Sequence, residues 1–112
     1  MPEIRYGVGA TSLRDLNQAL DTIWGELQDP ESNVRHEAEA RGIDLQKIFP
    51  LPRKDAISLK QEGEGFDPAT TAIIVAFSPV VAEVVRDLWR NVVLPRLRKQ
   101  KGEDALGDEK KP

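Results

Sequence analysis

Two short stretches of the chain contain residue types that do chemistry in other proteins. The first is Gly7-Val8-Gly9-Ala10-Thr11-Ser12, which lies between a short apolar alternation and the start of a helical pattern. The glycine-rich turn of a dinucleotide-binding fold has this placement, because its glycines let the backbone approach a pyrophosphate. Here Ser12 replaces the third glycine, and no second strand follows at the required distance. The stretch therefore predicts a turn that leads into a capped helix.

The second stretch, His36-Glu37-Ala38-Glu39-Ala40, begins like the helical zinc motif that places two histidines on one face. That motif needs a histidine at position 40, where this chain has alanine. His36 is the only histidine, and the absence of cysteine excludes thiol chemistry and cysteine-ligated metals. We therefore expect no catalytic residue, no metal, no cofactor and no small-molecule substrate, with His36 exposed on a helix.

Charge is distributed unevenly along the 112 residues, whose net charge is −3. Residues 1–85 carry 8 Lys/Arg against 14 Asp/Glu, whereas residues 86–112 carry 8 against 5. Such a basic block indicates a surface for an acidic partner, or it complements the negative end of a helix dipole. No aromatic residue lies within 96–101 to stack on bases, so we do not expect nucleic acid as the partner.

Apolar spacing predicts two helices in the first half of the chain. Leucine and isoleucine residues follow one another at intervals of three and four, which indicates a helix over 12–28 that is capped by Ser12. Gly25 interrupts this pattern, so either another backbone approaches there or the helix ends early. A second helix is expected to begin at Asp29 as its cap and to end before Gly42.

The C-terminal third has the strongest apolar pattern. Residues 72–77 are wholly apolar and fit either a buried helix or a buried strand, because their periodicity does not distinguish the two. Residues 81–92 have helical spacing and predict a helix that Leu94-Pro95 bends or ends. A short strand is expected at 56–61, and the polar residues 102–112 are expected to form a flexible tail.

These patterns predict one small α+β domain over residues 1–101. It should be dominated by three or four helices, with one or two short strands packed against them. A chain of this length buries roughly two-thirds of its unfolded surface, which is enough for one core. The N-terminus has no secretory pattern and cysteine is absent, so we expect a cytoplasmic protein.

The C-terminal helix is the expected binding surface. We expect a non-enzymatic protein–protein interaction or regulatory accessory module, whose partner is another protein or a second copy of the chain. Tryptophan and arginine often dominate interface energies, although Trp89 fits a core position equally well. The expected apolar anchors are Leu88, Trp89, Val92 and Val93, and the expected charged rim is Arg86, Arg90, Arg96 and Arg98.

The alternative function is peripheral membrane association. Its apolar element would be residues 69–85, and the basic end of the helix would meet an anionic lipid surface. The uncharged run within this element, Ala69–Ala82, is shorter than the ~20 residues that a transmembrane helix needs. This alternative therefore predicts a protein that lies on the membrane and does not span it.

The C-terminal residues also carry a resemblance. The pattern consists of Asp87-Leu88-Trp89-Arg90, then Val92-Val93-Leu94-Pro95-Arg96-Leu97, then Gly102-Glu103-Asp104-Ala105-Leu106-Gly107. It is similar to the C-terminal ends of short uncharacterised bacterial proteins that are associated with conflict or defence loci. The resemblance covers residues 67–107 and includes no catalytic motif. It implies an accessory or signalling module that works beside a separate effector protein.

Overall fold

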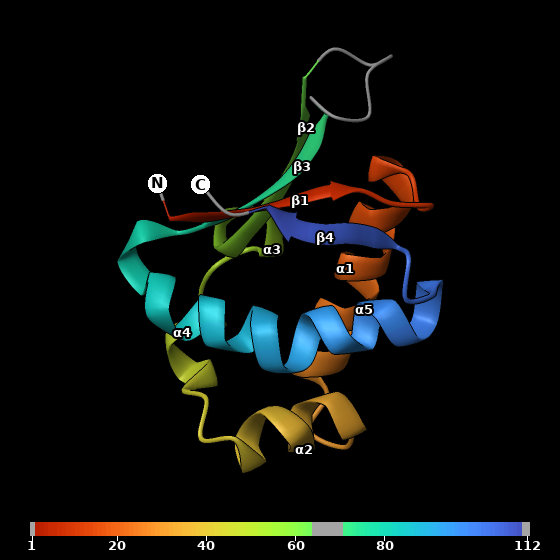
Figure 1. The fold of residues 1–112 in the computed structure, drawn as a ribbon. Helices are drawn as coiled ribbons and strands as arrows, with labels where there is room; N and C mark the ends of the chain where they lie inside the picture. The colour runs from red at the N-terminus through yellow and green to blue at the C-terminus, as the bar shows by residue number, and fades with distance from the viewer. Residues whose placement is uncertain (1, 64–70, 111–112) are drawn as a thin grey trace.

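The computed structural model describes residues 2–63 and 71–110. They form a four-stranded antiparallel sheet in the order β2-β3-β1-β4, with the helices on one side of it (Figure 1). The strands are β1 (Glu3–Val8), β2 (Ile57–Glu62), β3 (Ala72–Phe77) and β4 (Leu106–Lys110). The helices are α1 (Leu13–Gln28), α2 (Asn33–Ala40), α3 (Arg53–Ala56), α4 (Ala82–Leu88) and α5 (Leu94–Lys101), with 3-10 turns at Leu45–Lys47 and Pro79–Val81.

The α+β class is confirmed, but the sheet has four strands where one or two were expected. Residues 72–77, left open between helix and strand, form β3 in the interior of the sheet. Ile73 and Val75 face the helices, while Ile74 is buried on the opposite face. A strand that is buried on both faces has no alternation of polar and apolar residues. This explains why the sequence pattern did not distinguish a buried strand from a buried helix.

The flexible tail expected at 102–112 is wrong for residues 106–110, which form β4 and pair with β1. Two glycines allow this pairing. A Cβ at Gly107 would lie 2.8 Å from the backbone of Gly7, and a Cβ at Gly9 would lie 2.2 Å from the carbonyl oxygen of Asp104. The glycine turn at the start of the chain therefore packs directly against the backbone of the C-terminal residues.

Helix α1 has the predicted bounds. The hydroxyl of Ser12 accepts a hydrogen bond from the backbone N–H of Asp15 at 3.2 Å and caps the first turn. Gly25 neither ends the helix nor receives another backbone, because it is exposed and a Cβ there would meet nothing within 4 Å. The buried face of α1 consists of Leu16, Ala19, Leu20, Ile23, Trp24 and Leu27.

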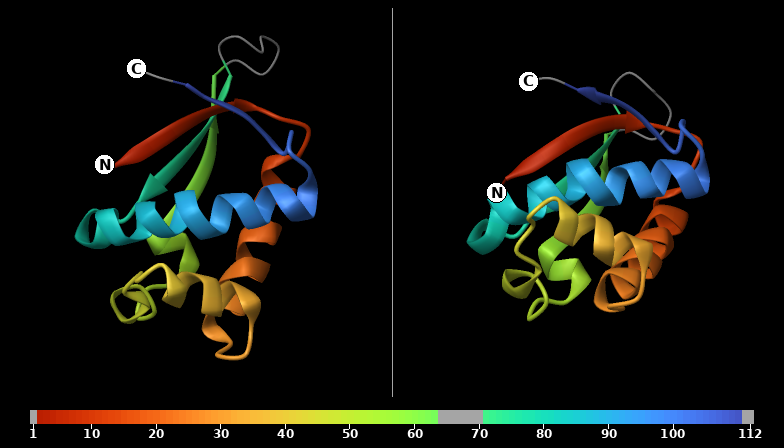
Figure 2. Two further views of the ribbon diagram at one scale, coloured as in Figure 1. Left: turned by 60° about the horizontal axis from the view of Figure 1, so that its bottom comes forward. Right: turned by 90° about the horizontal axis from the view of Figure 1, so that it is seen from below.

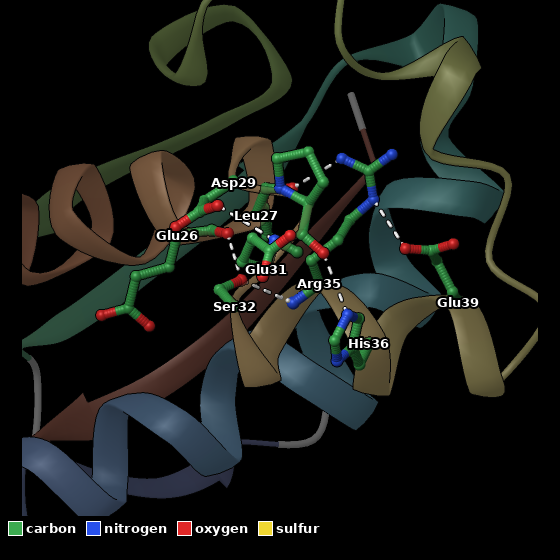
Figure 3. Close-up of polar contacts among 9 residues, drawn as sticks. Glu26, Leu27, Asp29, Glu31, Ser32, Arg35, His36 and Glu39 are labelled. Carbon is green, nitrogen blue, oxygen red and sulfur yellow. Dashed lines mark hydrogen bonds and ion pairs between the residues drawn. The ribbon is translucent and has the colours of Figure 1, made fainter.

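Helix α2 begins four residues later than Asp29, which was expected to cap it (Figure 3). The cap is Ser32, whose hydroxyl accepts from the N–H of Arg35 at 3.0 Å and donates to the carbonyl of Glu26 in the last turn of α1. Asp29 instead accepts from the N–H of Glu31 at 3.0 Å, within the turn. Ser32 is favoured as the cap because one hydroxyl satisfies the ends of both helices.

The helix over 81–92 does not end at Pro95. Helices α4 and α5 are joined by a π-helical turn, Trp89–Val93, into one continuous helix that crosses beneath the sheet (Figure 2). In this turn the N–H of Leu94 donates to the carbonyl of Trp89, five residues back. The wider turn shifts the hydrogen-bond pattern just before Pro95, which has no N–H to contribute and would crowd a regular α-turn.

Arg35 fastens α2 to its neighbours, so its removal should destabilise the fold. Its guanidinium donates to the carbonyl of Leu27 at 3.2 Å, pairs with Glu39 at 3.0 Å and lies 4.9 Å from the ring centre of Phe49. We expect Arg35→Ala to lower the free energy of unfolding by about 1–3 kcal/mol in urea titrations.

The matched control for Arg35 is Arg41→Ala. Arg41 directly follows α2 and pairs with Glu37 at 3.7 Å, but the two side chains of this ion pair are each about half exposed. An exposed pair contributes only about 0.2–1 kcal/mol. Equal losses in the two variants would contradict the importance of the contacts between Arg35 and the end of α1.

Candidate functional site

The four apolar residues expected as binding anchors lie in the core of this chain. Leu88 and Trp89 are 0 % exposed, and Val92 and Val93 are each 1 % exposed. They form the face of the long helix that packs against the sheet and against α1 and α2. The prediction of an exposed apolar surface here is wrong, because a stripe at helical spacing shows that a face is buried and not which molecule buries it.

Trp89 ties the long helix to β1 through Tyr6. Its indole N–H donates to the Tyr6 hydroxyl at 2.8 Å, and the ring centres are 6.1 Å apart with planes tilted by 59°. Tyr6 is only 2 % exposed. Burial raises the pKa of the Tyr6 phenol, and the hydrogen bond from Trp89 offsets a part of this rise.

The raised pKa of Tyr6 predicts that stability falls at alkaline pH. The folded protein holds the phenolic proton more tightly than the unfolded chain, whose tyrosine has the ordinary pKa of 10.0. The contribution of the Tyr6 phenol to the free energy of unfolding is therefore complete below pH 10.0. It is lost as the pH rises from there through the folded-state pKa of Tyr6. Tyr6 is the only tyrosine, so tyrosinate absorbance reports it alone, and urea titrations of Tyr6→Phe should have a flatter alkaline slope.

The apolar element of the membrane alternative is buried in its strand part. Its residues 72–77 form β3, where the side chains of Ile73, Ile74, Val75 and Phe77 are almost inaccessible, while residues 69 and 70 lie outside the described part of the chain. In the turn that follows, Val80 is exposed, and Val81, Ala82 and Val84 after it are only half-buried. None of the helices in residues 2–63 and 71–110 combines the length and the apolar character that a membrane crossing needs.

The four arginines expected as a charged rim do not share one surface. Arg86 and Arg90 are exposed and lie one turn apart at the start of the long helix. Arg96 is half-buried and pairs with Glu26 of α1 at 3.4 Å. Arg98 is half-buried further along, with a side-chain nitrogen enclosed by the protein. Only the first pair therefore belongs to an open site.

That site is a hollow of about 440 Å³ between the start of β1, the end of β4 and helix α4. Figure 1 shows the first residues of β1 and the last residues of β4 above this end of the long helix. We call it the basic hollow, and its lining consists of Glu3, Ile4, Arg5, Arg86, Arg90, Glu109 and Lys110.

The lining residues of the basic hollow include four basic and two acidic residues. Arg5 and Lys110, however, direct their charged groups across the outer face of the sheet, so the charges on the helix side are Arg86, Arg90 and Glu109. Arg90 pairs with Glu109 at 2.9 Å, and Arg5 lies 3.7 Å from Glu3. Arg5 also reaches Glu62 of β2 at 3.2 Å, across the outer face of the sheet. The hollow thus has more positive charge than its own carboxylates neutralise.

Arg86 has a different environment from the other cations of the hollow. Its guanidinium lies 5.9 Å from the ring centre of buried Phe77, which supports it by a cation–π contact. Lys110 donates to the carbonyl of Thr71 at 3.2 Å. Within the described residues Arg86 has no carboxylate partner. Its guanidinium can therefore donate hydrogen bonds to a carboxylate or a phosphate group of another molecule.

Sequence reasoning found Arg86 and Arg90 but missed the strand residues that complete the hollow. Arg5 and Lys110 lie opposite each other in the register of β1 and β4, although they stand at the two ends of the chain. The alternation of Glu3 and Arg5 with buried Ile4 and Tyr6 was an available signal for β1. No comparable alternation marks β4.

The remaining chemical candidates stay isolated. His36 is exposed on α2, and its Nε2 lies 2.9 Å from the carbonyl of Pro30, to which it donates (Figure 3). In the part of the chain that the structure describes, no three histidine, aspartate or glutamate side chains come together to hold a metal ion. The basic hollow contains arginine side chains, which bind anions.

Comparison with known proteins gives no match: no family model, no curated protein and no solved structure matches this chain. The C-terminal resemblance to proteins of conflict or defence loci therefore stays a prediction. The candidate site rests on the geometry of the basic hollow.

Proposed function

We propose that this chain is a non-enzymatic protein–protein interaction module that binds an acidic segment of a partner protein through the basic hollow. The observation that supports it most directly is the placement of Arg86, an exposed guanidinium without a carboxylate partner among the described residues. Arg90, one turn along the helix, and Arg5, on the facing strand, lie at the same hollow.

Arginine suits this role because its planar guanidinium donates two parallel hydrogen bonds to one carboxylate. The contacts already present in the hollow are easily exchanged. Arg90 and Glu109 are both partly exposed, and such a pair contributes only about 0.2–1 kcal/mol, so a partner's carboxylate can replace Glu109 at little cost. The charged rim expected from the sequence is thus reduced to the two helix arginines, Arg86 and Arg90.

The biological setting that we propose is that of an accessory or regulatory module that acts beside a separate effector protein. This part of the proposal rests on the C-terminal resemblance, whose residues are mostly structural here. Leu88 and Trp89 fill the core, and Gly102 ends α5 with a φ of 106°. Proteins with the same pattern are therefore expected to share this fold, whereas the pattern does not predict that they share a binding site.

The experiment is a titration of the full chain with a blocked hexaglutamate peptide, followed by NMR. We expect the largest shifts at the Arg86 and Arg90 side chains. Changing both residues to glutamine should weaken binding by about tenfold, because two charge-assisted contacts are lost. The matched control changes Lys99 and Lys101 to glutamine, which removes the same charge from an exposed part of the same helix.

An equal loss in both double variants would overturn the proposal, since it would show general attraction to a basic helix. Flotation with neutral and with anionic liposomes supplies the second arm. The proposal predicts no flotation at moderate salt. Salt-sensitive flotation with anionic vesicles alone would favour the membrane alternative and overturn the protein partner.

A further inference from the structure

The outer edge of β2 carries backbone groups that the sheet does not use. The N–H of Ser78 donates to the carbonyl of Ala56 at 3.1 Å, which shows that the backbone of Ala56 points toward β3. Antiparallel pairs alternate, so Ser58 and Lys60 point toward β3 as well, in the register of the two strands. Leu59 and Gln61 must then direct their N–H and C=O groups outward.

These outward groups have no partner in the described parts of the chain. β2 pairs with β3 alone, and no other backbone or side-chain contact involves the outward N–H and C=O groups of Leu59 and Gln61. The carbonyl of Ile57, which has the same orientation, accepts from Arg53 at 3.2 Å and shows that donors can reach this edge. An exposed strand edge of this kind is a template for one further strand.

A groove lies beside this edge. It has a volume of about 470 Å³ between β2, α1 and α3, and we call it the β2 groove. Its lining includes Arg14 and Asp21 of α1, Arg53 and Lys54 of α3, and the half-buried Leu59 of β2. A strand edge flanked by a helix is the arrangement in which proteins hold an extended peptide by β-augmentation.

The charges of the β2 groove indicate which peptide fits. Its only carboxylate among the described lining residues is Asp21, which already accepts from buried Arg53 at 2.8 Å. Arg14 and Lys54 are exposed and have no ion-pair partner in the described chain. The groove therefore presents two uncompensated positive charges beside the apolar surface of Leu59.

We propose that the β2 groove binds an extended acidic peptide segment of a partner protein, which adds to β2 as a fifth strand. Its backbone pairs with Leu59 and Gln61. Alternate side chains face the groove, so acidic ones meet Arg14 and Lys54 and an apolar one covers Leu59. A second copy of the chain is disfavoured, because edge-to-edge pairing would bring two positive grooves together. This proposal goes beyond the basic hollow and uses none of its residues.

The test titrates the full chain with the blocked peptide Glu-Thr-Val-Thr-Glu-Thr, whose two glutamates and one valine share a face of the strand, and, as its matched control, with Lys-Thr-Val-Thr-Lys-Thr. We expect only the acidic peptide to bind and to slow hydrogen exchange at the amides of Leu59 and Gln61. Changing Arg14 and Lys54 to glutamine should weaken binding by about tenfold. In the variant with glutamine at Arg86 and Arg90, this peptide should still slow hydrogen exchange at Leu59 and Gln61 as it does in the parent, which separates the two sites.

A backbone variant distinguishes strand addition from simple charge attraction. Gln61→Pro removes an outward N–H without removing a bond to β3, so the variant should fold and lose binding, whereas Gln61→Ala should retain it. Unchanged exchange at Leu59 and Gln61 in the presence of the acidic peptide would overturn the proposal. Equal binding of the lysine peptide, or self-association through this edge in sedimentation, would overturn it as well.

Discussion

Replacing Trp89 with alanine is expected to lower the free energy of unfolding by about 3–5 kcal/mol. The side chain is completely buried and is among the largest in the core, so its removal leaves a cavity between the long helix and β1. The change also leaves the Tyr6 hydroxyl without the indole N–H that it accepts from at 2.8 Å. Urea unfolding followed by circular dichroism measures the loss directly.

The control for Trp89 is Arg86→Ala, three residues earlier on the exposed side of the helix. This change should lower stability by no more than ~1 kcal/mol, because it removes only an exposed cation–π contact with Phe77. A double-mutant cycle of Trp89→Phe with Tyr6→Phe then isolates the hydrogen bond, with an expected coupling of about 0.5–1.5 kcal/mol. A Trp89→Ala variant as stable as the parent would contradict the core position and restore Trp89 as a candidate anchor.

The case of Trp89 shows where sequence reasoning reaches its limit in this chain. Helical spacing identified the buried stripe of the long helix correctly, in the same way as it identified α1 and its Ser12 cap. Both are local signals, since a helix makes its hydrogen bonds within a few residues. Whether a stripe is buried by the chain itself or by a partner depends on tertiary packing, which local periodicity does not encode.

The strands were harder to predict, for two different physical reasons. β3 lies between two other strands and is buried on both faces, so it has no alternation to distinguish it from a buried helix. β4 is an edge strand with a largely polar sequence, and its place is determined by the close approach of Gly107 to Gly7. A contact between residues so far apart along the chain leaves no local pattern.

The same distinction applies to the two candidate sites. Arg86 and Arg90 could be identified because they are neighbours on one helix. The basic hollow could not be assembled from the sequence, since it needs the register that places Arg5 opposite Lys110. The β2 groove was missed because its charges come from α1 and α3, which only the packed fold brings to the edge of β2.

The position of β4 can be tested by adding one methyl group. Gly9→Ala would place a Cβ 2.2 Å from the carbonyl oxygen of Asp104 and 2.6 Å from that of Ala105, so the backbone must shift. The φ of Gly9 is not in the left-handed region, and the steric clash is therefore the sole cause of the expected effect. We expect a loss of about 1–3 kcal/mol, with faster hydrogen exchange in residues 106–110.

The matched control is the same substitution at Gly25, which should act in the opposite direction. A Cβ there meets nothing within 4 Å, and alanine is favoured over glycine in a helix by about 0.5–1 kcal/mol, so Gly25→Ala should raise stability. Gly9→Ala should also weaken hexaglutamate binding, because displacement of β4 opens one wall of the basic hollow, whereas Gly25→Ala should leave it unchanged. If Gly9→Ala left both stability and exchange in β4 unaltered, the close approach of Asp104 to the glycine turn would be wrong. The side of the basic hollow that β4 forms would then lose its support.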